Sequence, residues 1–160
     1  MLADTLRASV QAGACVTFIL LFSHADAEQY WREKVLPPLR AGDRRVLVAR
    51  ANEKIVGTVQ LDIDMPPNQQ HRAAVMKLLV HPEARRRGIA RALMTAVEDA
   101  ARDERRTLIT LDTRTGDAAE SLYVSMGYKL VGVIPNFSRA PESESLEAAT
   151  FFYKELASKE

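Results

Sequence analysis

Cysteine is nearly absent from this 160-residue chain, which contains one, Cys15. A single cysteine cannot form an internal disulfide, so nothing indicates an oxidising compartment and we expect a cytoplasmic protein. The chain has three histidines, and no group of His, Cys and Asp has the spacing of a metal site, so we expect no metal. No base lies near Cys15 in the sequence, which favours a buried thiol over a nucleophile.

The chain also lacks an excess of either charge, since 22 Lys+Arg and 21 Asp+Glu leave a net charge of +1. This balance argues against a strongly basic nucleic-acid-binding protein and against an acidic disordered chain. The apolar run at residues 14–22 is far shorter than the ~20 residues of a membrane helix, so we expect no membrane partner. We interpret the run as a buried segment. The alternative, the core of a secretory signal, is weakened because Arg7 is the one basic residue before it.

The length and the 47% of hydrophobic residues fit a single domain, residues 1–160. Apolar spacing and turn residues predict the elements in this order: helices 2–12 and 23–40, strands 45–51, 55–64 and 73–80, helix 88–105, strand 107–112, helix 118–126, and strands 128–134 and 148–156. The central strand–helix–strand unit implies a parallel crossover, and the hairpin before it implies an antiparallel part. We therefore predict an α/β (α+β) fold with a mixed sheet flanked by helices.

A basic loop with one glycine connects strand 73–80 to helix 88–105. Four arginines flank that glycine: Arg85, Arg86, Arg87 and Arg91. Free backbone N–H groups and the helix dipole attract anions at a helix start, and Gly88 would let a ligand approach the backbone. The pattern matches neither the Walker loop nor Gly-x-Gly-x-x-Gly. Taken alone, it favours a solvated basic helix cap over a pyrophosphate site.

Three motifs in order resemble the GNAT superfamily of N-acetyltransferases. They are an apolar strand followed by a proline and Arg-x-x-Gly-x-Ala at a helix start, Leu111-Asp112-Thr113 at the next strand end, and Leu122-Tyr123-x-x-Met126-Gly127-Tyr128. The resemblance covers roughly residues 46–156. Within the superfamily it looks closest to the group around the tabtoxin-resistance acetyltransferase. Three features carry that closer match: Asp-Thr-x-x-Gly-x-x-Ala-Glu, Lys-Leu-x-Val-x-Pro, and Gly13-Ala14-Cys15-Val16-x-Phe18.

The resemblance implies acetyl-CoA as cosubstrate, with a coenzyme-binding core at about residues 73–127. Backbone groups of the basic loop would hold the pyrophosphate, and the strand before it would pair with the pantetheine arm. The residues so implied are Leu78, Leu79, Val80, Arg85, Arg86, Arg87, Gly88, Ile89, Ala90 and Arg91. In the family, strands 73–80 and 107–112 splay apart and the thioester lies between them.

Two residues are candidates for proton transfer. Tyr123 matches the family's general acid, which would protonate the departing thiolate. The alternative is a core tyrosine on the apolar face of a short helix. An acceptor amine must lose a proton before it can attack, and Asp112 is the best candidate base, with a turn residue as the alternative.

The base is the less certain of the two roles. Many relatives carry an acidic residue where this chain has Ala74, so His71, Asp62 or Asp64 could act instead.

We expect direct acetyl transfer to the amine of a small molecule such as a toxin, antibiotic, amino acid or polyamine. Phe18 and the loops at 65–71 and 135–147 would order this substrate, and four carboxylates would favour a cation: Asp62, Asp64, Asp112 and Glu142. Alternatives are a protein N-terminal or lysine acetyltransferase and a catalytically silent coenzyme A sensor. A nucleic-acid module is disfavoured because no aromatic residues interleave with the basic run. The predicted elements do not include the family's first strand, so a homodimer that completes the edge is a further hypothesis.

Overall fold

The computed structural model describes residues 1–14, 22–141 and 143–157. The helical elements are α1 (Leu2–Gln11), α2 (His24–Tyr30), the π-helical η1 (Trp31–Val35), α3 (Leu36–Ala41), the short 3₁₀ turns η2 (Pro67–Gln69) and η3 (Pro82–Ala84), α4 (Ile89–Asp103) and α5 (Ala118–Ser125). The strands are β1 (Arg44–Ala51), β2 (Lys54–Asp62), β3 (Arg72–Val80), β4 (Leu108–Arg114), β5 (Lys129–Arg139) and β6 (Leu146–Glu155). The predictions for Cys15, Phe18 and Glu142 lie outside the described residues.

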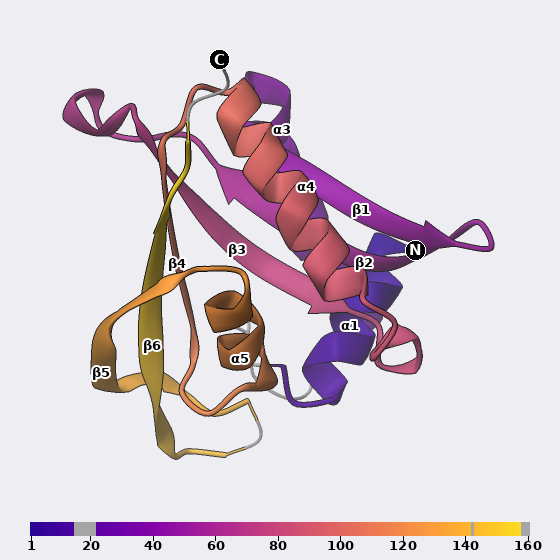
Figure 1. The fold of residues 1–160 in the computed structure, drawn as a ribbon. Helices are drawn as coiled ribbons and strands as arrows, with labels where there is room; N and C mark the ends of the chain where they lie inside the picture. Colours follow the sequence, from indigo (N-terminus) through magenta and orange to yellow (C-terminus); the bar gives the residue numbers. More distant parts are fainter. Residues whose placement is uncertain (15–21, 142, 158–160) are drawn as a thin grey trace.

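The six strands form one mixed sheet in the order β1-β2-β3-β4-β6-β5 (Figure 1). Only β3 and β4, which α4 connects, run parallel, and the other neighbouring strands are antiparallel. The predicted mixed sheet with a central parallel crossover is therefore confirmed. Within the described chain, the sheet begins at β1 and has no strand beyond it.

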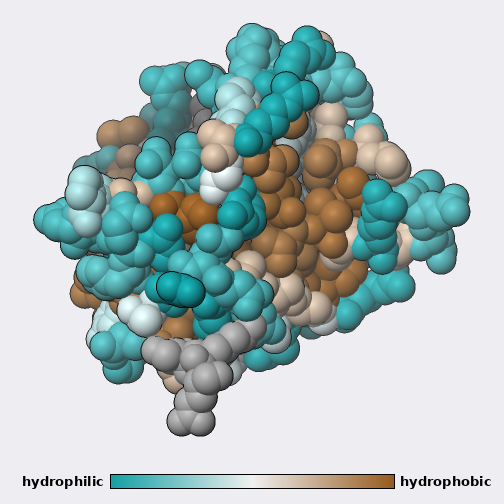
Figure 2. All heavy atoms as spheres, turned by 90° about the horizontal axis from the view of Figure 1, so that it is seen from above, coloured by the Kyte–Doolittle hydropathy of each residue, from teal (hydrophilic) through white to brown (hydrophobic). Residues whose placement is uncertain are grey.

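Helices cover both faces of the sheet. On one face α4 packs on β1, β2 and β3, and its apolar side closes the larger core cluster. On the other face α1 packs on β2 and β3 and closes a smaller cluster with α2. Figure 2, seen from above Figure 1, shows mostly hydrophilic residues around one hydrophobic area. No helix in the described ranges has the length and apolarity to cross a membrane.

The predicted helix at 23–40 is divided into three segments. Ser23 caps the first: its hydroxyl accepts a hydrogen bond from the Asp26 N–H at 3.1 Å, and the Asp26 carboxylate accepts one from the Ser23 N–H at 2.7 Å. After α2 the chain continues as η1, and α3 carries Pro37 and Pro38 in its first turn. Prolines have no N–H to donate, so the hydrogen-bond pattern changes here, although helical residues continue without a break from His24 to Ala41, as predicted.

The prediction of a polar loop at 135–147 is wrong. Instead, β5 continues to Arg139 and pairs with β6, which begins at Leu146. Pro135 ended the predicted strand because proline cannot donate a ladder hydrogen bond. However, β5 is an edge strand whose register shifts next to this proline, and both features make a proline tolerable.

Candidate functional site

The strands β3 and β4 separate partway along their length. Their parallel pairing ends at Ala74 and Thr110, whereas β3 continues to Val80 and β4 to Arg114. Figure 1 shows them diverging toward the end of the sheet where α5 lies. A cavity of about 1060 Å³ lies between the separated parts of β3 and β4, and it is also lined by the end of α1 and the starts of α4 and α5.

Most of the residues proposed from the sequence line this cavity. They are Leu78, Leu79, Val80, Arg85, Arg86, Gly88, Ile89, Ala90, Arg91, Asp112 and Tyr123. Arg87, in the same basic loop, does not line it. The fold therefore places β3, the basic loop, the start of α4 and the side chains of Asp112 and Tyr123 around the same cavity.

The alternative bases lie elsewhere. None of His71, Asp62 and Asp64 lines the cavity, and Asp62 instead forms an ion pair with Arg44 at 3.1 Å. None of the described residues of the loops at 65–71 and 135–147 lines this cavity, so their role in ordering the substrate stays a prediction. Of the described carboxylates expected to favour a cation, Asp112 alone is at the site.

The start of α4 has backbone geometry suited to an anion. Gly88 precedes the helix with a φ of +78°, and nothing lies within 4 Å of the position that a Cβ would take. Glycine adopts this conformation without strain and leaves the first N–H groups of α4 open to the cavity. These N–H groups and the helix dipole favour a negatively charged ligand.

Three arginines add full positive charges to this end of the cavity: Arg85, Arg86 and Arg91. Arg85 Nε donates to the Val80 carbonyl at 3.4 Å. Arg91 Nη2 donates to Ser125 Oγ at 2.7 Å and so connects α4 to α5. The cations surround the helix start, where they can form charge-assisted hydrogen bonds to phosphate oxygens.

Gly57 on β2 allows the first turns of α4 to pack closely on the sheet. A Cβ at this position would lie 3.0 Å from Leu93 Cδ1, 3.1 Å from Ile89 Cγ2 and 3.1 Å from the Leu79 carbonyl oxygen. The absence of a side chain therefore sets the position of the helix start beside the cavity.

A β-bulge at Lys77 changes which side chains of β3 face each side of the sheet. Lys77 has a φ of +54°, and the pairing with β2 shifts register beside it. Val75 packs in the cluster beneath α4, whereas Leu79 packs in the cluster beneath α1. Residues 75 and 79 of a regular strand would face the same side. The bulge therefore directs Lys77 and Leu79 to the α1 side, while Leu78 packs against the α4 cluster.

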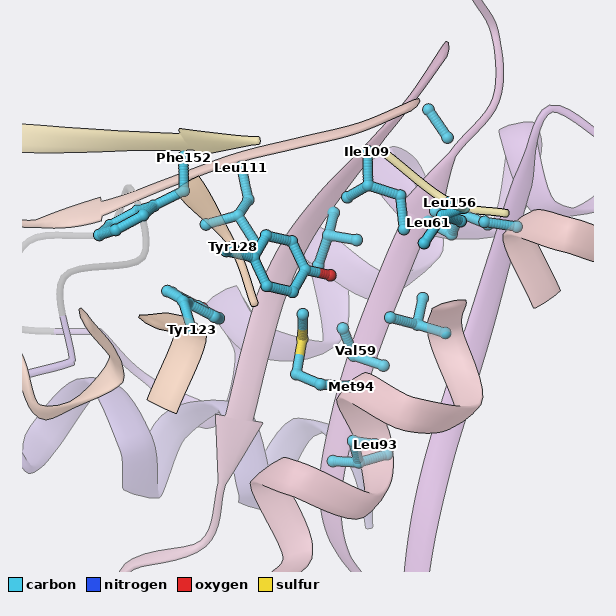
Figure 3. Close-up of a cluster of buried hydrophobic side chains, with 14 of the residues drawn as sticks. Val59, Leu61, Leu93, Met94, Ile109, Leu111, Tyr123, Tyr128, Phe152 and Leu156 are labelled. Carbon is cyan, nitrogen blue, oxygen red and sulfur yellow. The ribbon is translucent and has the colours of Figure 1, made fainter. Parts of the chain in front are cut away.

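Tyr123 reaches the cavity from α5, on the α4 side of the sheet. The residue is 5% exposed, and its ring centroid lies 5.7 Å from that of Tyr128 and 5.8 Å from that of Phe152 (Figure 3). The ring is thus part of the core, as one interpretation of the sequence predicted, while the residue also lines the cavity. Burial, with smaller contributions from Asp117 and Asp112, raises the pKa of Tyr123 well above its ordinary value of 10.0. The hydroxyl therefore stays protonated across the neutral range and can donate a proton.

Asp112 faces the opposite side of the sheet. Its neighbour on β4, Leu111, packs in the α4 cluster, and alternation along the strand directs Asp112 to the α1 side. Burial raises the pKa of the Asp112 carboxyl above its ordinary value of 3.8, while the nearby Lys77 ammonium opposes this increase. A carboxylate with a raised pKa is a better proton acceptor than an ordinary aspartate.

Part of the cavity wall was missed by the sequence analysis. The end of α1 contributes Ser9, Ala12, Gly13 and Ala14, and the bulge contributes Lys77. The first helix was predicted to end at residue 12, but no pattern in the sequence indicates that this end lies against β3. Among the described residues, no group of three or more His, Cys, Asp or Glu is placed to hold a metal.

Residues 14–128 match the model of the acetyltransferase (GNAT) family. Because this match covers more than half of the chain, the chain belongs to the acetyltransferase (GNAT) family.

Among curated proteins, N-acetyltransferase 8 from Homo sapiens is 42% identical over 87 residues, which are 53% of this chain and 38% of that protein. N-acetyltransferase 8F1 from Rattus norvegicus is 31% identical over 134 residues, 76% of this chain and 61% of that protein. The chain thus spans less than two thirds of the length of these relatives. The predicted closer resemblance to the tabtoxin-resistance group is wrong, since the relatives found are N-acetyltransferase 8 proteins. Short spacings at strand ends do not separate groups that share the same fold.

Solved structures agree on the fold. The ribosomal-protein-alanine N-acetyltransferase from Brucella melitensis has a TM-score of 0.78 at 22% identity, with 97% of this chain and 92% of that chain covered. The yncA protein from Salmonella typhimurium, solved with its cofactor acetyl-CoA, has a TM-score of 0.77 at 17% identity and coverage of 99% and 88%. At these identities the likeness shows the fold alone.

Proposed function

We propose that this protein transfers the acetyl group of acetyl-CoA directly to the amine of a small molecule. The observation that carries the proposal is the gap between β3 and β4, which has Tyr123 on one side of the sheet and Asp112 on the other. The names of the N-acetyltransferase 8 relatives support N-acetyl transfer. The single domain spanning residues 1–160, with a coenzyme-binding core at about 73–127, is part of the same proposal.

The cavity fits acetyl-CoA in two respects. The open backbone at Gly88 and the three cavity arginines suit the pyrophosphate. Beyond Ala74 the β4-facing edge of β3 is not paired with β4, so the backbone of Leu78, Leu79 and Val80 can receive an extended arm as an added strand. Bound there, the cosubstrate would supply an acetyl thioester.

The two proton-transfer residues would act from opposite sides of the gap. On the α1 side, the Asp112 carboxylate takes one proton from the acceptor ammonium and frees the nitrogen lone pair to attack the acetyl carbon. On the α4 side, the Tyr123 hydroxyl gives one proton to the sulfur as the carbon–sulfur bond breaks, and the second proton that the nitrogen loses as the amide forms restores the hydroxyl. An N–H of residues 78–80 can donate to the carbonyl oxygen as it gains negative charge. The acceptor thus enters from the side opposite α4.

A small acceptor is favoured because parts of the fold border the cavity on the α1 side, where the acceptor enters. The end of α1 lies on one flank, and the β4–α5 connection with Thr113 and Gly116 lies on another. A protein N-terminus or a lysine side chain is the alternative acceptor, and a panel of short peptides tested beside small amines separates the two. If peptides are acetylated and small amines are not, the small-molecule proposal fails.

The first experiment is a thermal-shift titration with acetyl-CoA, with ATP and NAD as controls. A ligand at ~100 times its dissociation constant adds about 2.7 kcal/mol. For a chain of this length we expect a rise in Tm of roughly 5–10 °C with acetyl-CoA alone. No rise in a protein that melts cooperatively would contradict both the acetyltransferase and the coenzyme A sensor.

The second experiment separates an enzyme from a silent coenzyme A sensor. Tyr123→Phe removes one hydroxyl and should lower kcat by roughly 10²–10⁴-fold while keeping the Tm shift with acetyl-CoA. Tyr153→Phe on β6, at a residue that does not line the cavity, is the matched control and should keep full turnover. Equal turnover of wild type and Tyr123→Phe would exclude Tyr123 as the acid.

A further inference from the structure

Lys77 is a charged residue at the gap to which the reaction above gives no role. It lines the same cavity as Asp112. Its Nζ lies 5.9 Å from the centroid of the Tyr30 ring, within the range of a cation–π interaction. The ammonium is thus held at a defined place on the α1 side of the sheet.

The ring beneath Lys77 is itself held by buried polar groups. The Tyr30 hydroxyl accepts a hydrogen bond from Gln60 Nε2 at 3.2 Å, and Gln60 is fully buried. Gln60 Oε1 accepts from Arg44 Nη1 at 3.4 Å, and Arg44 is paired with Asp62 at 3.1 Å. Tyr30 also ends α2 directly before the π-helical turn η1, and such turns recur at functional sites. The network makes the ring a fixed support rather than a mobile surface aromatic.

Lys77 and Asp112 project to the same side of the sheet from strands that have just separated. Thr110, paired with Ala74, and Asp112 two residues later share one side of β4. The bulge places Lys77 on the side of Leu79, beneath α1. A regular strand would place residue 77 with Val75 on the α4 side, so the bulge brings the cation to the carboxylate.

The other charged groups around Asp112 act differently. Asp117, at the start of α5, lines the same cavity and is negative. Arg114, on the same strand, is engaged by Asp117 at 3.9 Å and by Glu147 at 3.5 Å. Phe151 lies opposite Asp112 on β6 and carries no charge. Arg114 also lines the cavity, whereas the other three arginines that line it, Arg85, Arg86 and Arg91, belong to its α4 end.

We propose that Lys77 is a positioning residue whose ammonium, held over the Tyr30 ring, keeps the Asp112 carboxylate ionised and ready to take the proton of the acceptor amine. This inference rests on the proposed function, in which Asp112 takes that proton. The protein withdraws the Asp112 carboxyl partly from water, which favours its protonated form, and that form cannot accept a proton. A cation on the same side of the gap stabilises the ionised form.

The test is a pH titration of the Asp112 carboxyl carbon by NMR, with the signal assigned through Asp112→Asn. In Lys77→Met, which keeps the aliphatic chain and removes the charge, the Asp112 midpoint should move to higher pH. In Lys77→Arg, which restores the charge, the midpoint should stay close to that of wild type. Lys54→Met is the matched control at an exposed cation of the β1–β2 hairpin and should leave the midpoint unchanged.

The same variants give a second readout in acetyl transfer. The acidic limb of the kcat/KM profile should move to higher pH in Lys77→Met by the amount that the NMR midpoint moves. The proposal is overturned if the Asp112 midpoint does not move in Lys77→Met, or if it moves equally in Lys54→Met. It is also overturned if Lys77→Arg folds but its Asp112 midpoint differs from that of wild type. A loss confined to KM for acceptors that bear a carboxylate would also overturn it, because Lys77 would then bind the acceptor.

The titration separates this inference from the proposed function. It needs neither acetyl-CoA nor an acceptor, so it can be carried out on a protein that shows no activity. A wild type that acetylates no amine would refute the proposed function. The Asp112 midpoint in the two Lys77 variants would still decide whether Lys77 holds that carboxylate ionised.

Discussion

A buried ion pair between Glu98 and Lys154 connects α4 to β6. Both carboxylate oxygens of Glu98 accept hydrogen bonds from Lys154 Nζ at 2.8 Å, and the Glu98 side chain is 6% exposed. Lys154 Nζ also lies 5.3 Å from the centroid of Tyr128, whose ring packs on Tyr123. Lys154→Met removes the cation and leaves the carboxylate buried, with Arg102 at 3.6 Å as its remaining partner.

The expected cost follows from this geometry. Removing one partner of a buried pair costs about 3–5 kcal/mol. Because Arg102 remains, we expect the low end, about 3 kcal/mol, which for this chain length lowers Tm by roughly 6–12 °C. Urea unfolding followed by circular dichroism measures the change in the free energy of unfolding. The double variant Glu98→Leu/Lys154→Met should recover to within about 1 kcal/mol of wild type, because an apolar pair no longer buries a charge.

The matched control is the exposed pair of Lys129 and Glu155, 3.6 Å apart, with side chains 62% and 73% exposed. Lys129→Met should cost less than about 0.5 kcal/mol, since water screens such pairs. A cost below about 1 kcal/mol for Lys154→Met, or a double variant as unstable as the single one, would refute the reasoning.

Three further predictions concern packing and protonation. Gly57→Ala should cost about 1–3 kcal/mol by forcing the start of α4 away from β2, and it should also weaken the Tm shift with acetyl-CoA; an unchanged shift would contradict the role of Gly57 in placing the helix. Above pH 10 the unfolded chain loses the phenol protons of Tyr123 and Tyr128, whereas burial raises the pKa of both in the fold, so stability should fall by up to about 1.4 kcal/mol per pH unit for each. In urea titrations from pH 9 to pH 11, the free energy of unfolding of Tyr128→Phe should decrease less steeply than that of wild type. An equal slope would count against a contribution from the buried Tyr128 phenol. Asp112→Asn should abolish acetyl transfer and raise the free energy of unfolding at pH 7. The pKa of Asp112 is raised in the fold, so wild type loses the stabilising protonated form of this group as pH rises, whereas asparagine does not ionise. The gain in stability over wild type should therefore shrink as pH falls toward 3.8.

Several features could be predicted from local patterns. The bounds of the strands from β1 to β4 and of α4 lie within two residues of the predicted ones, because each has a strong apolar period and clear turn residues at its ends. The capping role of Ser23 and the basic loop before α4 could be predicted for the same reason. A proline misled the prediction at the strand end at Pro135, because its effect depends on the edge position of the strand.

The site shows where local patterns stop being informative. Tyr123 and Asp112 were proposed from the motifs around them, and both line the cavity. His71, Asp62 and Asp64 were equally plausible in sequence, and the fold excludes them from the cavity. Whether a carboxylate reaches the gap depends on which face its strand presents, and pairing with distant strands decides that face.

By itself, the sequence determined the order of helices and strands and indicated the basic start of α4 and the candidates Tyr123 and Asp112, because these depend on neighbours along the chain. Tertiary structure alone decided that β3 and β4 separate after Ala74, that the end of α1 lines the cavity, and that the bulge directs Lys77 toward the side of Asp112. The physical reason is that strand pairing and the packing of helices on both faces join residues far apart in the chain. A lysine in a strand has no feature in the sequence that shows which partner it will meet.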